Sequence, residues 1–163
     1  LLSMVCNFSQ GGKYQAVQDD IDTILKVSES SRIAMASLAS EDKVVFSKVM
    51  AAYKLPKETE SQKKMRLSEI QVCLIDCAQV PFELMVESSK LFELALQLKG
   101  IGNKNLLSDV FVAAHLLYAG LLSARENVEI NLASINDKNF CESKRLEMNQ
   151  LIEKSKEIYQ SIS

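Results

Sequence analysis

The sequence has 163 residues, a length that fits one domain with one sizeable hydrophobic core. Apolar residues make up 47% and charged residues 25%, which is a globular composition and excludes an intrinsically disordered chain. The net charge is −2 with both signs interspersed, and there is no tryptophan, so we expect no nucleic-acid partner. The chain has only five glycines and two prolines, so it contains few residues that end helices or form tight turns. We therefore expect an all-α fold, a multihelical array of long and short helices without a sheet.

The first third of the chain predicts three helical segments. Residues 1–8 are typical of the end of a helix that stops near Gly11. Apolar residues spaced three and four apart predict an amphipathic helix over about residues 14–39. Ser40 is a preferred N-cap residue, so we expect a separate helix to begin there and to end near Lys54, just ahead of a proline.

The next helix is expected over about residues 60–99. Pro81 lies inside this pattern, and a proline in a helix interior removes one backbone hydrogen bond and clashes with the preceding turn. We therefore expect a kink or a break at Val80–Pro81. Gly100 is in a suitable position to end the helix. Farther on, Asn136 or Asp137 is expected to cap a last helix.

The stretch from Gly100 to Ile135 is apolar on nearly every face, so it predicts a buried core helix. A membrane span is the less favoured interpretation, because polar residues interrupt the run. These residues are Asn103, Asp109, His115, Asn127 and Asn131. Burying such groups without partners is costly, so they either connect parts of the core or line a pocket.

The cysteines indicate a reducing compartment. No Cys-x-x-Cys pair occurs, and we expect the four thiols to be small core residues of a cytoplasmic protein. The only histidine, His115, is far from them in sequence, so we expect no zinc site. The N-terminal residues lack a basic segment, so we expect no signal peptide.

Two groups of short motifs carry a resemblance to a known family. The first combines Glu41-Asp42-Lys43-Val44-Val45-Phe46 with Met50 and Lys54-Leu55-Pro56-Lys57-Glu58-Thr59. The second combines Gly102-Asn103, Ser108-Asp109, Val112-Ala113-Ala114, Asn127-Val128 and Ile130-Asn131-Leu132. In this order and spacing they resemble the cyclodeaminase/cyclohydrolase family. It comprises the cyclodeaminase part of formiminotransferase-cyclodeaminase and the stand-alone methenyltetrahydrofolate cyclohydrolases of some bacteria.

The resemblance covers nearly the whole chain, which we interpret as a single domain over residues 1–163. Leu2-Ser3-Met4-Val5 resembles the end of the family's first long helix, so the N-terminal part of that helix is expected to lie outside this sequence. The resemblance implies an all-helical homodimer that acts on the one-carbon unit between N5 and N10 of tetrahydrofolate. It further implies a folate substrate, with polyglutamylated forms included, and no metal or redox cofactor. We expect no membrane partner.

The resemblance also implies roles for individual residues. The family's catalytic carboxylate falls on Asp42, although Lys43, Val44 and Val45 replace the small residues of the usual pattern. We expect Asp42, in the first turn of a helix, to act as general acid and base. Asp109 is the second catalytic candidate, as charge partner of the cationic carbon or as a pterin acceptor, or else as a carboxylate at a helix start.

Two further sets of residues are candidates for substrate binding. Asn103, Asn127 and Asn131 offer amide donors and acceptors to the pterin, or else cap helices and bridge the core. The basic side chains of Lys54, Lys57, Lys63 and Arg66 are expected to hold the glutamate tail, or else to form a solvated loop. The sequence does not separate cyclodeaminase from cyclohydrolase. The alternative from another class is a non-catalytic helical interaction module.

Overall fold

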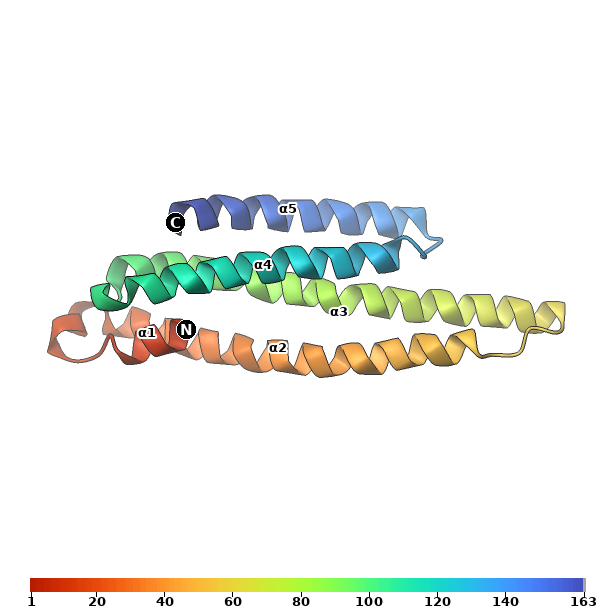
Figure 1. The fold of residues 1–163 in the computed structure, drawn as a ribbon, viewed down its shortest axis with the longest axis horizontal. Helices are drawn as coiled ribbons and strands as arrows, with labels where there is room; N and C mark the ends of the chain where they lie inside the picture. Colours follow the sequence, from red (N-terminus) through yellow and green to blue (C-terminus); the bar gives the residue numbers. More distant parts are fainter. Residues whose placement is uncertain (163) are drawn as a thin grey trace.

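The structure is a computed structural model that describes residues 1–162, and it is all-helical within them, as predicted. Four long helices follow one another in antiparallel order (Figure 1). They are α2 (Gln18–Tyr53), α3 (Glu60–Ile101), α4 (Leu107–Leu132) and α5 (Lys138–Ile162). Three short elements complete the fold: α1 (Leu2–Asn7) and the 3₁₀ helices η1 (Gly12–Val17) and η2 (Lys104–Leu106).

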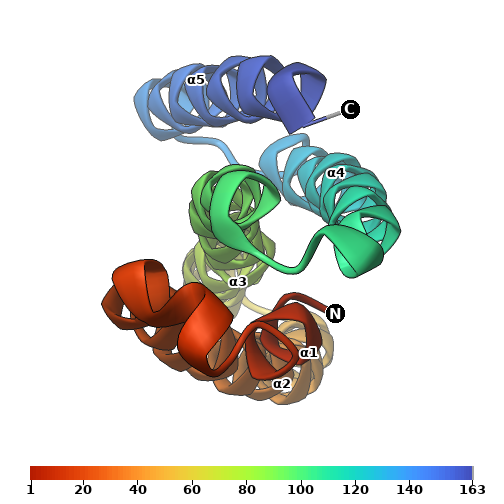
Figure 2. The ribbon, with the colours of Figure 1, turned by 90° about the vertical axis from the view of Figure 1, so that its left-hand side faces the viewer.

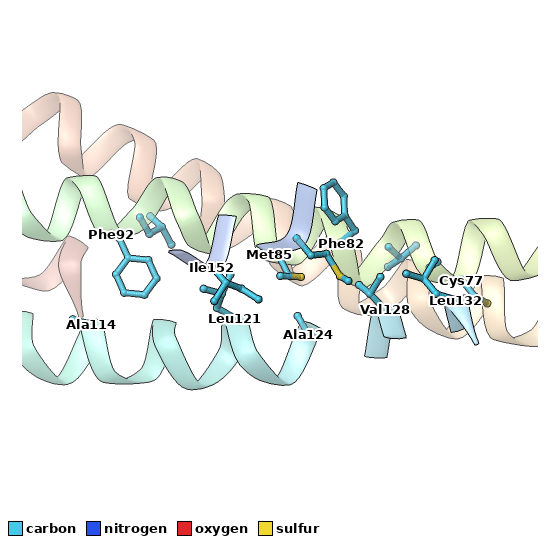
Figure 3. Close-up of a cluster of buried hydrophobic side chains, with 14 of the residues drawn as sticks. Cys77, Phe82, Met85, Phe92, Ala114, Leu121, Ala124, Val128, Leu132 and Ile152 are labelled. Carbon is cyan, nitrogen blue, oxygen red and sulfur yellow. The ribbon is translucent and has the colours of Figure 1, made fainter. Parts of the chain in front are cut away.

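Helix α3 is the centre of the array. It packs against α2, α4 and α5, and the end view shows it between α2 and α5 with α4 beside it (Figure 2). In the close-up, Met85 and Phe92 of α3 face Leu121 and Val128 of α4 (Figure 3). These four side chains are fully buried, and burial of each stabilises the fold by about 1.5–3 kcal/mol.

Helix α2 continues through the position where two separate helices were predicted. The expectation of a new helix at Ser40 is wrong: Gln18–Tyr53 is one helix of 36 residues. The Ser40 hydroxyl donates to the carbonyl oxygen of Ala36 at 3.2 Å, which is the bonding of a serine inside a helix and not of an N-cap. Ser40 is a residue type that often caps helices, but no glycine or proline precedes it, and helix α2 continues through it.

Helix α3 likewise continues through Pro81, so the predicted break at Val80–Pro81 does not occur. Pro81 has no N–H to offer the carbonyl oxygen of Cys77 four residues earlier. The side-chain amide of Asn131, on α4, donates to that oxygen at 3.1 Å instead. A neighbouring helix thus replaces the hydrogen bond that the proline removes.

The other helix ends follow local signals. Thr59 and Gln62 form a reciprocal capping box at the start of α3, close to the predicted boundary. The Asp137 carboxylate accepts from the Phe140 N–H at 3.0 Å and caps α5, as predicted. Gly100 does not end α3: the helix runs to Ile101, and Gly102 is the C-cap residue.

Helix α4 is not buried on all sides, contrary to the expectation for its apolar sequence. Val110, Leu121 and Val128 are buried, whereas Leu116 and Ile130 are 63% and 71% exposed. Lys104–Leu132 is the one segment among residues 1–162 long and apolar enough to cross a membrane, a test that core helices also pass. In this structure its buried side packs on α3 and α5.

The cysteines behave as predicted. Cys6, Cys73, Cys77 and Cys141 are all free and buried. They are therefore small core residues in this fold.

Candidate active site

A cavity of about 300 Å³ lies where α2, α3 and α4 meet. Helices α2 and α4 both pack on α3 at this level, and Figure 2 shows the three helices together. The residues that line the cavity are Met35, Leu38, Ala39 and Asp42 of α2, Val80, Pro81 and Leu84 of α3, and Asn127 of α4. Asp42 and Asn127 are the polar side chains of an otherwise apolar wall. The structure thus brings together two of the residues that the sequence singled out.

Asp42 lies in the interior of α2 and not in the first turn of a helix, which corrects the expectation based on Ser40. A helix dipole acts only on the first and last turns, so it does not stabilise this carboxylate. The carboxylate is exposed and has no salt bridge or hydrogen bond among residues 1–162. It is therefore available to a ligand in the cavity.

Cys77 of α3 is a buried thiol that interacts electrostatically with Asp42. Burial raises the pKa of its thiol to about 11, and the negative charge of Asp42 adds to the effect. The thiol is therefore protonated near neutral pH and is a poor nucleophile. Asp42 shares a cavity with Val80 and Pro81, so it lies on the side of α2 that faces α3.

Asn127 and Asn131 occupy successive turns of α4. Asn127 lines the cavity opposite Asp42. The amide nitrogen of Asn131 donates both to Cys77 O at 3.1 Å and to Asn127 O at 2.8 Å. The donors of Asn131 are therefore engaged with the protein backbone, directly behind the cavity wall.

Asn103 and Asp109 lie at the N-terminal end of α4, whereas the cavity with Asp42 lies beside its C-terminal half. Asp109 precedes Asn127 by 18 residues, which corresponds to about 27 Å along a helix. The Asn103 side chain donates to Phe8 O at 3.0 Å and accepts from the Asn105 N–H at 3.1 Å. Within one chain, the structure does not bring either residue to the cavity.

His115 lies on α4 between these two groups. It is exposed, so of the two bland interpretations of this residue, a core or an interface histidine, the first does not apply. Its Nδ1 is 2.9 Å from the Tyr159 hydroxyl, and the two rings meet edge to face. The histidine thus helps to join α4 to α5.

The basic residues lie beyond the C-terminal end of α2. Lys54 follows Asp42 by twelve residues, or about 18 Å along the helix. Arg66 donates to the Tyr53 carbonyl oxygen at 3.1 Å and lies over the Tyr53 ring, so it caps α2. Lys63 is paired with Glu60 at 2.7 Å, whereas Lys54 and Lys57 are exposed. Binding of a glutamate tail by these side chains stays a prediction.

A second cavity of about 360 Å³ adjoins the first. The two share Met35 and Leu84, and the second extends between α2 and α4 towards α1, past Ser28, Arg32 and Ser88. Met35, Leu84 and the Pro81 ring were not predicted as wall residues, because apolar residues at helical spacing give no signal that separates a cavity wall from a packed core.

Comparisons with known proteins found relatives that align over most of the chain. A family model described as formiminotransferase-cyclodeaminase matches residues 1–150. A methenyltetrahydrofolate cyclohydrolase of Methylorubrum extorquens is 36% identical over 153 residues, which cover 93% of this chain and 74% of that protein. A formimidoyltransferase-cyclodeaminase of Rattus norvegicus is 29% identical over 157 residues, 96% of this chain but only 29% of that longer protein.

A solved structure shows the same fold. The crystal structure of formiminotetrahydrofolate cyclodeaminase from Thermotoga maritima matches with a TM-score of 0.88 and 31% identity, over 99% of this chain and 77% of that one. The sequence match and the structural match thus extend over nearly the whole chain. The chain belongs to the formiminotransferase-cyclodeaminase family.

Proposed function

We propose that the protein is an enzyme of folate one-carbon metabolism that acts on C–N bonds at the N5/N10 bridge of tetrahydrofolate. Relatives named methenyltetrahydrofolate cyclohydrolase and formimidoyltransferase-cyclodeaminase both align with more than nine-tenths of the chain. The observation that carries the proposal is the unpaired Asp42 carboxylate in an otherwise apolar cavity, opposite Asn127.

The two candidate reactions need the same groups. In the cyclohydrolase reaction, water adds to the methenyl carbon, the bond from that carbon to N5 breaks, and 10-formyltetrahydrofolate forms. In the cyclodeaminase reaction, N10 adds to the formimino carbon, and ammonia leaves as the methenyl bridge forms. Each reaction takes a proton from the nucleophile and gives one to a leaving nitrogen, and one carboxylate can do both in turn. Neither reaction changes an oxidation state.

Asp42 has a second role in this proposal. The methenyl group and the protonated formimino group both carry positive charge. A carboxylate beside them in an apolar cavity stabilises that charge more than it would in water. Because Asp42 has no cationic partner among residues 1–162, this interaction does not compete with an existing salt bridge. Asn127 supplies amide donors and acceptors to the pterin from the opposite wall.

The active protein is a cytoplasmic homodimer in this proposal. Exposed apolar side chains on α2 and α4 support a helical interface, among them Phe46, Val112 and Leu116. Four free thiols support a reducing compartment. The exposed Lys54 and Lys57 support binding of a glutamate tail, single or polyglutamylated.

The methenyl chromophore tests the activity and separates the two reactions. The purified protein is mixed with 5-formiminotetrahydrofolate or with methenyltetrahydrofolate, and the absorbance of the methenyl group is followed. A cyclodeaminase forms the chromophore from the first substrate, and a cyclohydrolase removes it from the second. No turnover of either substrate, together with no binding of tetrahydrofolate polyglutamate in calorimetry, would instead support the non-catalytic interaction module.

A further inference from the structure

The interior of α3 contains a proline at the cavity wall, and this choice leaves a backbone group without its normal partner. Pro81 lines the cavity and is buried. Residue 81 of a regular helix would donate its N–H to the carbonyl oxygen of Cys77, but proline has none. Cys77 itself is buried, so its carbonyl oxygen needs a donor from within the protein.

Asn131 provides that donor. Its amide nitrogen lies 3.1 Å from Cys77 O and 2.8 Å from Asn127 O. Both partners are carbonyl oxygens, which only accept hydrogen bonds, so the nitrogen and not the oxygen of the amide must face them. One side chain thus joins α3 to α4 and to the preceding turn of α4.

The place of this bridge connects it to the site. Asn127 and Pro81 both line the cavity, and Asp42 lies across from them. Asn131 holds the backbone at Asn127 and the backbone one turn before Pro81 at the same time. The bridge therefore links the backbones behind two walls of the cavity, and the carboxylate lies on the third helix.

We propose that Asn131 is a positioning residue: by donating to the Cys77 carbonyl that Pro81 leaves free, it fixes Asn127 and the Val80–Pro81 wall relative to Asp42. The inference rests on the proposed function of the cavity. It differs from the expectation that Asn131 binds the pterin, because its donors act on the protein backbone. Pro81 and Asn131 then form a coupled pair, in which the asparagine matters because the proline is present.

The test is a double-mutant cycle in the whole protein, with wild type, Asn131→Leu, Pro81→Ala and the double variant. Leucine has the same branched arrangement of side-chain heavy atoms as asparagine but no donor. We expect N131L to lower kcat by roughly tenfold with KM little changed, because misplacement of catalytic groups affects the chemical step. In the P81A background, residue 81 has an N–H for Cys77 O, so adding N131L should change kcat by less than about twofold.

Other outcomes would contradict either the positioning role of Asn131 or the proposed function. A loss of kcat that is equal in both backgrounds, or a rise in KM in both, would overturn the positioning role and favour direct contact with substrate. If N131L alone does not fold, the double variant is expected to fold and turn over at a rate near that of P81A, and its failure to fold would also overturn the inference. An inactive wild type would overturn the proposed function and this inference with it, whereas an active wild type with an unimpaired N131L would overturn this inference alone.

Discussion

The two ends of α4 both carry polar residues, but these residues have different surroundings. At the N-terminal end, the Asn103 N–H donates to the Ser9 hydroxyl at 2.8 Å, and its side chain bonds Phe8 O and the Asn105 N–H. Lys104 donates to two carbonyl oxygens at the end of α3. At the C-terminal half, Asn127 faces a cavity and an Asp42 carboxylate that has no partner among residues 1–162.

The polar groups of the turn thus hold the fold, whereas the Asp42 carboxylate is available to a ligand. The turn between α3 and α4 has its hydrogen bonds satisfied within the chain, so its side chains are explained by stability alone. The exposed Asp42 carboxylate makes no such hydrogen bond among residues 1–162, so it does not hold the fold in this way. The proposed chemistry therefore belongs to the middle of the array, and the turn has a structural role.

The largest expected effect is that of Asp42→Asn on turnover. In the proposed mechanism the Asp42 carboxylate accepts and returns the proton, and an amide cannot do so, so we expect kcat to fall by about a hundredfold or more. Helix content in circular dichroism should remain, because the side chain is exposed and unpaired. Glu41→Gln is the matched control: it changes the neighbouring exposed carboxylate, which does not line the cavity, and should leave turnover unchanged. Near-normal turnover by D42N would remove Asp42 from the mechanism.

Alanine substitutions of the two glycines at the turn, Gly100 and Gly102, should change stability in opposite directions. A Cβ on Gly102 would lie 2.7 Å from Leu98 O, so Gly102→Ala should lower the free energy of unfolding by about 1–3 kcal/mol. A Cβ on Gly100 meets nothing within 4 Å, and the residue is helical, so Gly100→Ala should raise stability by about 0.5–1 kcal/mol. Urea denaturation measures both. Equal changes in stability for the two variants would show that the close approach of residue 102 to Leu98 O does not determine the turn.

Asn103→Ala tests whether the turn asparagine is structural. It removes two side-chain hydrogen bonds, and we expect a loss of about 1 kcal/mol of stability in urea denaturation, with KM for the folate unchanged. A KM raised tenfold at unchanged stability would instead support the pterin-binding role that the sequence suggested.

Asp109→Asn measures how separate the two ends are. Because Asp109 lies about 27 Å along α4 from Asn127, we expect kcat to change by less than tenfold. A loss as large as that of D42N would mean that Asp109 reaches a site through a second copy of the chain. Gel filtration of both variants at the assay concentration controls for a change in assembly.

The sequence predicted most helix boundaries where a local signal is strong. A proline near the end of α2, the Thr59 capping region and Asp137 are such signals, and the observed ends lie within a few residues of the predicted ones. The helix start expected at Ser40 and the break expected at Pro81 do not occur, because a cap residue or a proline ends a helix only if no other group compensates. At Pro81 the compensating group is Asn131, 50 positions later in the sequence.

The site was predictable only in part. The motif match placed Asp42 and Asn127, and the structure brings both to one cavity. The distance from Asp109 to that cavity follows from the length of α4 and from its packing on α3. Whether an asparagine bonds the backbone or faces a cavity depends on neighbours from other helices, which the local pattern does not contain.

The smallest expected effect concerns Cys77 and tests whether the Asp42 carboxylate faces α3. Burial and then the charge of Asp42 raise the Cys77 pKa to about 11. Removing that charge in D42N should lower this pKa and speed alkylation by iodoacetamide at a fixed alkaline pH, because the thiolate is the reactive form. Cys6 is an internal control, since burial also raises its pKa to about 11 but its acidic neighbour is Asp22. Mass spectrometry of the two cysteine sites should show faster alkylation at Cys77 and no change at Cys6. An equal change at Cys6 would indicate general loosening of the fold. No change at Cys77 would place the Asp42 carboxylate away from α3.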